Sequence, residues 1–182
     1  MKYFFILLSV YLIAPPTSSA HETEKIDGLW RTACMVDIGS FLSQIHLKNG
    51  TFKIKEWDYP VGDLTCAFPR SVSVIEGLVD LPAPNHIDYL RVKHIITPLT
   101  RDVADHYNKI WPAGLCGFKD WKARVSKNVP LDCHGHTVTY SIYKIENRLL
   151  HLGAGYGDDD GSTPEKRHGD WGHAYFRIAQ QP

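Results

Sequence analysis

The residues of this chain whose chemistry is easiest to predict are four cysteines: Cys34, Cys66, Cys116 and Cys133. They follow a leader in which Lys2, an apolar run over residues 4–14 and small residues up to Ala20 form the pattern of a secretory signal peptide. An even number of cysteines in an exported protein favours two disulfides over a catalytic thiol. We therefore predict a signal peptide over residues 1–20, cleaved after Ala20, and a secreted or periplasmic mature protein over residues 21–182.

Two other groups of residues invite a metal ion. The run from Asp158 to Ser162 carries carboxylates two positions apart, as calcium sites do, but Thr163 stands where an EF-hand loop requires glycine. Cys133 with His134 and His136 offers zinc ligands, but an oxidising compartment favours the disulfide, and no second Cys or His pair completes the zinc spacing. We predict neither a metal nor another cofactor.

The sequence gives little support for catalysis, for nucleic-acid binding or for membrane insertion. The chain has no Gly-x-Ser-x-Gly elbow and no His-Glu-x-x-His run, so we predict that it is not an enzyme, with an exported hydrolase as the remaining catalytic alternative. Lysine plus arginine and aspartate plus glutamate number 20 each, so no broad field attracts nucleic acid or anionic lipid. The leader is too short to span a bilayer comfortably, and no later apolar run is long enough, which predicts no stable membrane insertion.

The elements that must position these residues are mostly strands. Lys48-Asn49-Gly50 separates two alternating runs and suits a tight hairpin turn, although Asn49 with Thr51 also spells a glycosylation acceptor. A helix is expected to start at Thr97-Pro98 and to stop before Pro112. Period-2 alternation and turn residues predict about eight strands, over residues 28–36, 41–47, 51–57, 71–81, 86–96, 136–145, 148–152 and 171–178.

The segment 111–135 is irregular and rich in glycine, proline and aromatic residues, with two of the cysteines near its ends. A loop of that length is unusual in a compact domain unless it is clipped at its base, here by a disulfide. We call residues 111–135 the excursion. Consecutive antiparallel strands in one domain close most naturally into an up-and-down barrel. The predicted fold is therefore all-β, an eight-stranded antiparallel barrel with one helical, disulfide-clipped insertion.

Three motifs extend this interpretation: Gly28-x-Trp30-x-x-x-Cys34, Tyr59-x-x-Gly62-Asp63-x-x-Cys66, and Cys116-Gly117-Phe118-x-Asp120-Trp121 leading to Cys133. Together they resemble the lipocalin-like domain of the adenomatosis polyposis coli down-regulated family, which comprises animal Wnt antagonists and bacterial relatives. The resemblance is to a bacterial-type, single-domain member, with Arg167-His168 where the family usually has Arg-Pro. It implies a lipocalin-like barrel, a cup for an acyl chain or similar apolar ligand, and disulfides Cys34–Cys66 and Cys116–Cys133.

These expectations assign roles to a few further residues. Trp111, Phe118 and Trp121, on the excursion, are candidates to contact a ligand at the barrel mouth, together with Tyr89 and Tyr140. Arg167 and Arg177 are expected to close the other end of the barrel by stacking on Trp30, in preference to binding a ligand carboxylate. The leading hypothesis is a non-catalytic carrier of a hydrophobic or acylated small molecule. The alternative is an extracellular protein-interaction module, Wnt-antagonist-like, that uses the excursion.

Overall fold

The computed structural model describes residues 26–36, 39–133, 135–155 and 158–178. The predicted signal peptide lies outside the described residues, as does His134. The described chain is mostly β, with one short α-helix, α2 (Arg101–Tyr107), and one turn of 3-10 helix, η1 (Pro164–Lys166). The strands are β1 (Gly28–Arg31), β2 (Met35–Val36), β3 (Ser40–Lys48), β4 (Thr51–Tyr59), β5 (Ser71–Asp80), β6 (His86–Pro98), β7 (Lys127–Asn128), β8 (Val138–Glu146), β9 (Leu149–Ala154) and β10 (Asp170–Arg177).

The sheet closes on itself. Antiparallel pairing runs from β3 through β4, β5, β6, β8, β9 and β10 to β1, and β1 pairs in turn with β3. At the closure, Trp30 of β1 is opposite both Arg177 of β10 and Ile45 of β3. The predicted eight-stranded antiparallel barrel is therefore confirmed, and the two short strands β2 and β7 only extend its edges along β3 and β6.

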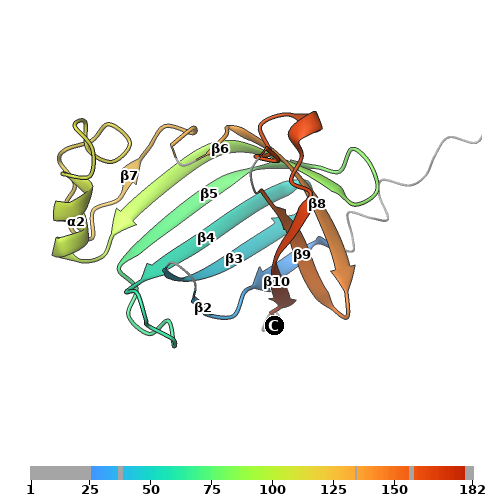
Figure 1. Ribbon diagram of the computed structural model, residues 1–182, viewed down its shortest axis with the longest axis horizontal. Helices are drawn as coiled ribbons and strands as arrows, with labels where there is room; N and C mark the ends of the chain where they lie inside the picture. Colours follow the sequence, from blue (N-terminus) through green and yellow to red (C-terminus); the bar gives the residue numbers. More distant parts are fainter. Residues whose placement is uncertain (1–25, 37–38, 134, 156–157, 179–182) are drawn as a thin grey trace, which may run out of the picture.

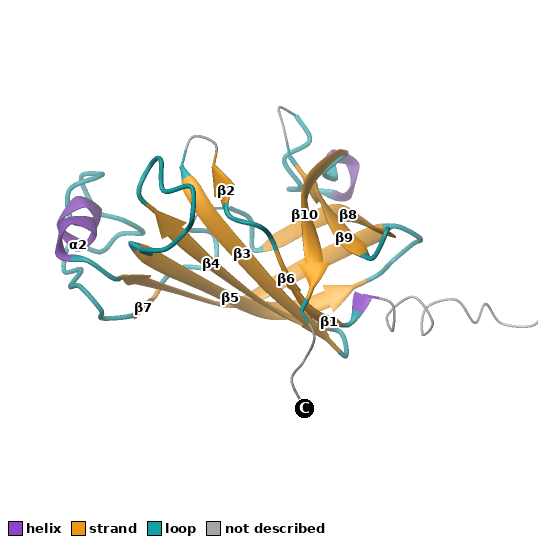
Figure 2. Cartoon of the chain, turned by 90° about the horizontal axis from the view of Figure 1, so that it is seen from below, coloured by secondary structure: helices purple, strands orange, loops and turns teal. Residues whose placement is uncertain are grey.

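The barrel is not a uniform cylinder. Strands β3 to β6 are long and continue toward the end of the molecule that carries α2, whereas β8, β9 and β10 cross over them at the opposite end (Figures 1 and 2). The first part of β6 pairs with β8, and its last part pairs with β7. The wall is therefore closed at one end and flares open toward the other.

Local sequence explains two of the turning points. Asn49 and Gly50 have φ values of 51° and 71°, as the predicted turn between β3 and β4 requires. Between β5 and β6, Glu76 faces Lys93 while Gly77 faces Arg91, so the register shifts by one residue. A β-bulge of this kind bends a strand and reverses which side chains point inward.

Hydrophobic residues gather in two clusters. The first fills the narrow end of the barrel and comprises Ile26, Trp30, Ile45, Leu47, Phe52, Ile75, Ile87, Tyr89, Tyr143 and Leu150. The second lies beneath the excursion, against the end of β6, and comprises Ile96, Ala104, Leu115, Trp121 and Val129. No described residue belongs to both clusters.

The helix differs from its predicted position. We expected it to begin at Thr97-Pro98, but β6 continues through Pro98, which is paired with Ser71 of β5, and the N-cap is Thr100. The backbone N–H of Leu99 still donates to Arg70 O at 2.7 Å. Proline lacks an N–H group and is tolerated at the end of a strand, so Pro98 does not mark a helix start here.

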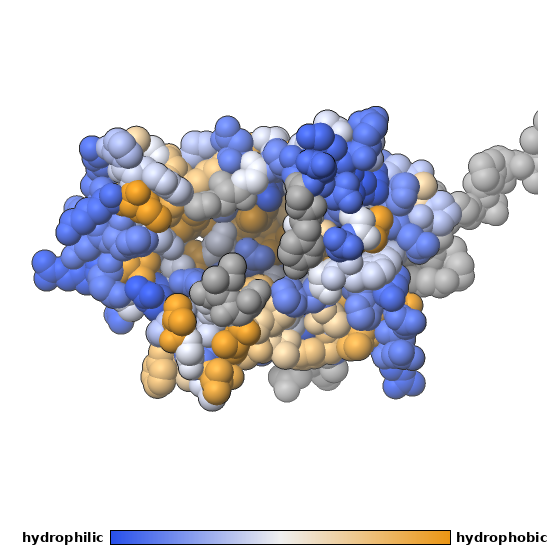
Figure 3. All heavy atoms as spheres, viewed as in Figure 1, coloured by the Kyte–Doolittle hydropathy of each residue, from blue (hydrophilic) through white to orange (hydrophobic). Residues whose placement is uncertain are grey.

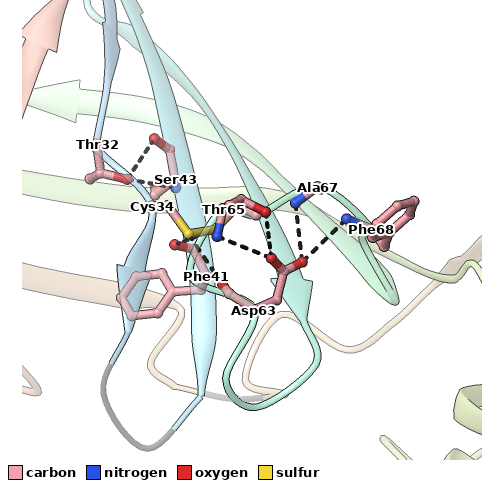
Figure 4. The surroundings of a disulfide bond; sticks show 9 residues. Thr32, Cys34, Phe41, Ser43, Asp63, Thr65, Ala67 and Phe68 are labelled. Atoms are coloured by element: carbon pink, nitrogen blue, oxygen red, sulfur yellow. Dashed lines mark hydrogen bonds between the residues drawn. A yellow bond between two sulfur atoms is a disulfide. The ribbon is translucent and has the colours of Figure 1, made fainter.

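Both disulfides pair as expected. Cys34–Cys66 links the segment after β1 to the β4–β5 loop, and Cys116–Cys133 closes the excursion at its base. Beside the first disulfide, the Asp63 carboxylate accepts hydrogen bonds from Thr65 and from the backbone N–H groups of Ala67 and Phe68 (Figure 4). These hydrogen bonds lower the pKa of Asp63, with the side-chain bond from Thr65 as the largest cause. The β4–β5 loop is thus held in one shape by a covalent link and one carboxylate.

Candidate ligand cavity

A cavity of about 250 Å³ lies on the inner face of the barrel, above the first core. Its lining residues come from β4, β5, β6, β8, β9 and β10, and one comes from the loop before β10. They are Phe52, Ile54, Glu56, Ile75, Tyr89, Arg91, Thr139, Ser141, Leu152, Gly153, His168 and Tyr175. The space-filling view shows a hollow on one face of the molecule, with hydrophobic surface inside it and hydrophilic residues on its left and right sides (Figure 3).

The floor and one wall of the cavity are apolar. Phe52, Ile54, Ile75 and Leu152 belong to the first core or pack against it. The Phe52 and Tyr89 rings meet edge to face, with centroids 5.1 Å apart and an interplanar angle of 80°. Such aromatic pairs hold each other in one orientation, so this floor is preformed.

Opposite charges border the same cavity. Glu56 on β4 and Arg91 on β6 interact electrostatically, and desolvation shifts each of them against its charged form. It raises the pKa of Glu56, which the charge of Arg91 and a hydrogen bond with Ser43 only partly oppose. Glu56 keeps solvent-accessible surface because it borders the open cavity, yet the surrounding protein still displaces enough water to disfavour its carboxylate. The Arg91 guanidinium lies close to Gly135, where an added Cβ would be 2.9 Å from its Nη2.

Hydroxyl groups connect the charged pair to the floor. The Tyr175 hydroxyl lies 3.4 Å from Ser43 Oγ, and Ser43 also hydrogen-bonds with Glu56. Desolvation is the main cause that raises the pKa of Tyr175 to about 12. The Tyr89 hydroxyl is buried and has no hydrogen-bond partner among the described residues, and its pKa is raised well above the ordinary value by desolvation and by Tyr175. The cavity therefore contains a buried donor that the described protein leaves unsatisfied.

His168 forms part of the cavity wall where the loop before β10 meets the barrel. Its backbone N–H donates to Tyr140 O at 3.1 Å. Its imidazole sits against three glycines, because a Cβ on Gly153, Gly155 or Gly161 would lie between 2.5 and 3.0 Å from the His168 side chain. Because these glycines have no side chains, they leave room for the imidazole ring. Packing against them holds the ring in place.

Of the two tyrosines that we expected at the ligand, one lines the cavity. Tyr89 lies on its floor with 8% of its surface exposed. Tyr140 does not line it, because alternation along β8 places its neighbours Thr139 and Ser141 inward. Instead, the Tyr140 ring lies 5.5 Å from the Arg167 guanidinium.

The two arginines have different roles from each other. Arg177 lies over the Trp30 ring at 4.5 Å, at the narrow end of the barrel. Arg167 was expected there too, and this is wrong: it forms an ion pair with Asp88 and donates to Ser141 O at 2.7 Å. A half-buried carboxylate attracts a guanidinium more strongly than an indole that Arg177 already covers. Arg167 thus fastens the loop before β10 to the barrel wall.

The aromatic residues of the excursion lie away from the cavity. Trp121 is only 3% exposed and belongs to the second core, where its indole N–H donates to Leu115 O at 3.3 Å. Phe118 packs against Trp121 with centroids 6.0 Å apart. Trp111 is 49% exposed and borders a surface groove of about 440 Å³ beside the Cys116–Cys133 disulfide. None of the three lines the barrel cavity, so the structure does not place them in contact with a ligand held there.

Glu56 and Arg91 are site residues that the sequence analysis did not single out. A signal for Glu56 was present, because Phe52, Ile54 and Glu56 recur at every second position of one strand and so share a face. The same holds for Ile87, Tyr89 and Arg91 on β6. Burying a charge is costly unless it has a polar partner. A charged residue on the otherwise apolar inward face of a strand therefore indicates a polar partner inside the barrel.

No protein-family model matches the chain, and no curated protein matches it. The resemblance to the adenomatosis polyposis coli down-regulated family therefore stays a prediction. Within the described ranges, no three His, Cys, Asp or Glu side chains are grouped so as to hold a metal ion, and none of the helices there is long and apolar enough to cross a membrane.

Proposed function

We propose that this chain is an exported, non-catalytic binding protein that holds a small hydrophobic or acylated molecule inside its barrel. The observation that supports the proposal most directly is the cavity of about 250 Å³ above the apolar floor of Phe52, Ile54 and Ile75. Eight-stranded barrels are wide enough for one small ligand, and ligand pockets are mostly apolar with a few placed polar groups. The two disulfides favour an oxidising compartment, in agreement with export.

Burial of apolar surface provides the driving force for such binding. Each 100 Å² of ligand surface removed from water contributes roughly 2.5 kcal/mol. A cavity of this size lies near the lower end of the range for drug-sized ligands, which begins at about 300 Å³. The proposal therefore favours a medium-length acyl chain or a compound of similar size over a long lipid.

The test is ligand binding by the mature, disulfide-bonded protein. Native mass spectrometry of protein from its own host reports any copurified ligand, and thermal unfolding with a medium-chain fatty acid reports added stability. Ile75→Phe narrows the cavity and should reduce the thermal shift. Leu78→Phe is the matched control, because Leu78 lies on the same strand but is 50% exposed on the outer face. An unliganded mass together with no thermal shift from any apolar probe would reject the proposal.

The excursion supports a second candidate function, an extracellular protein-interaction module of the Wnt-antagonist-like kind. The exposed Trp111 beside a groove lined by Gly114, Pro130 and the Cys116–Cys133 disulfide favours it, because exposed tryptophans are enriched at interface hot spots. Trp111→Ala should weaken chemical cross-linking to extracellular proteins of the host. Trp171→Ala, at a tryptophan 44% exposed on β10, is the control. Equal cross-linking by both variants and the wild type would remove this candidate.

A further inference from the structure

The polar side of the cavity carries more information than the apolar side about what binds there. Glu56 and Arg91 place one negative and one positive charge at the same cavity, so the site has no net charge while both are ionised. A ligand ion of either sign is attracted by one member of the pair and repelled by the other. It must also lose its own hydration, which neither member fully repays.

Tyr89 adds a requirement for an acceptor. Its side chain is more than nine-tenths buried, it lines the cavity, and its hydroxyl has no hydrogen-bond partner among the described residues. Buried polar groups in folded proteins are normally hydrogen-bonded, and an exception calls for an explanation. A ligand atom that accepts a hydrogen bond at this position supplies one.

From this arrangement we propose that the barrel recognises a neutral head group that is both acceptor and donor, and that a carboxamide on a short hydrocarbon chain is the class that fits. Its carbonyl oxygen accepts hydrogen bonds from Arg91 and the Tyr89 hydroxyl, and its N–H donates to the Glu56 carboxylate. The hydrocarbon lies on Phe52, Ile54 and Ile75. This inference rests on the proposed function and specifies its ligand.

The donor and acceptor inventory excludes the two charged alternatives. An ionised carboxylate accepts hydrogen bonds but cannot donate, so it satisfies Tyr89 and Arg91 while facing Glu56 with a like charge. An ammonium donates but cannot accept, so it satisfies Glu56 while leaving the Tyr89 hydroxyl without a partner and facing Arg91. Of these three head groups, only the neutral amide satisfies all three side chains together.

The experiment compares three probes with the same eight-carbon chain: octanamide, octanoate and octylammonium. Isothermal titration with the mature, disulfide-bonded protein at neutral pH gives each Kd. Because one well-made hydrogen bond in such a site changes affinity by about tenfold, octanamide should bind at least about tenfold more tightly than either ion. Equal affinities for the three probes, or a preference for one of the ions, would overturn the inference.

Two variants test the assignment of the charges. Glu56→Gln leaves the site with the charge of Arg91 alone, so octanoate should gain affinity relative to octanamide. Arg91→Gln leaves the charge of Glu56 alone, so octylammonium should gain instead. Glu76→Gln and Lys93→Gln are the matched controls, because these residues form an ion pair between β5 and β6 and do not line the cavity. Control variants that change the preference as much as the cavity variants would contradict the proposal.

The outcomes separate this inference from the proposed function. If none of the three probes binds, and longer or apolar probes also fail, the barrel is not a carrier and both conclusions fall. If all three bind with similar Kd values and Ile75→Phe weakens each of them, the carrier function stands and the head-group assignment is wrong. The wild-type series alone tests the head-group assignment, so that test holds even if a variant does not fold.

Discussion

Removal of the Tyr89 hydroxyl should stabilise the free protein, against the usual effect of trimming a buried side chain. Tyr89→Phe keeps the ring and its edge-to-face contact with Phe52 at 5.1 Å. It removes only a hydroxyl that is buried and has no hydrogen-bond partner among the described residues. The substitution therefore takes away a desolvation cost and no compensating bond.

The magnitude follows from that cost. An unsatisfied buried donor costs about 1–3 kcal/mol. For a chain of this size, 1 kcal/mol corresponds to about 2–4 °C in melting temperature. We expect Tyr89→Phe to raise the melting temperature of the unliganded protein by roughly 2–12 °C. The same variant should bind octanamide about tenfold more weakly, because the donor to its carbonyl is gone.

The assay is thermal unfolding of the unliganded, disulfide-bonded protein, followed by circular dichroism. Tyr175→Phe is the control, since the Tyr175 hydroxyl lies 3.4 Å from Ser43 Oγ and so has a partner to lose. That variant should lower the melting temperature or leave it unchanged. If Tyr89→Phe lowers it as much as Tyr175→Phe does, the Tyr89 hydroxyl is satisfied in solution and the reasoning about an unsatisfied donor fails.

The remaining predictions concern pH and packing. The pKa of Tyr175 is about 12 against an ordinary 10.0, so its neutral form contributes stability that is complete below pH 10 and is lost as the pH rises toward 12, by roughly 2 kcal/mol. Urea unfolding up to about pH 11 should show a shallower loss in Tyr175→Phe, and equal slopes would contradict this. The raised pKa of Glu56 penalises its carboxylate in the folded state once the pH exceeds 4.5, so Glu56→Gln should raise the melting temperature more at pH 7 than at pH 4. Gly77→Ala places a Cβ 2.0 Å from Leu90 O and should cost at least about 1–3 kcal/mol, whereas Gly39→Ala, with nothing within 4 Å, should cost far less in the same denaturation series.

The strand pattern of this chain is readable from sequence because local and long-range preferences agree. Asn49-Gly50 fixes the first hairpin through the positive φ that both residues adopt. Alternation then carries the register along β3 and β4, and consecutive antiparallel strands leave few topologies other than an up-and-down barrel. The disulfide pairing was expected from the cysteine spacing and from the family resemblance, and both bridges are present.

The helix and the excursion were harder to predict because tertiary contacts override their local signals. Thr97-Pro98 has the composition of a helix start, yet the pairing of Pro98 with Ser71 holds it in β6. Trp121 was expected near a ligand because it lies on a long loop. Instead, Asn108 bonds with both the N–H and the C=O of Trp121, and these bonds draw its indole into the second core. Neither contact is visible from residue type and spacing.

The inward position of His94 depends on a backbone irregularity that sequence does not announce. Simple alternation along β6 puts Arg91 inward and His94 outward. The bulge opposite Gly77 instead brings both to the inner side of the sheet, and His94 is 3% exposed. The position at which the ladder shifts decides which side chains change face. Glycine permits such a bulge but also occurs in strands for other reasons, so Gly77 alone does not predict it.

The bridge at the base of the excursion has a consequence for a molecule whose chain is cut within that segment. Arg124 is exposed and lies between Cys116 and Cys133, so a trypsin-like protease that cuts after it leaves two pieces tied by one sulfur–sulfur bond. The ladder between β6 and β7 also spans the cut. Such a nicked protein runs as a single species on a denaturing gel until a reductant is added, and it then separates into two pieces.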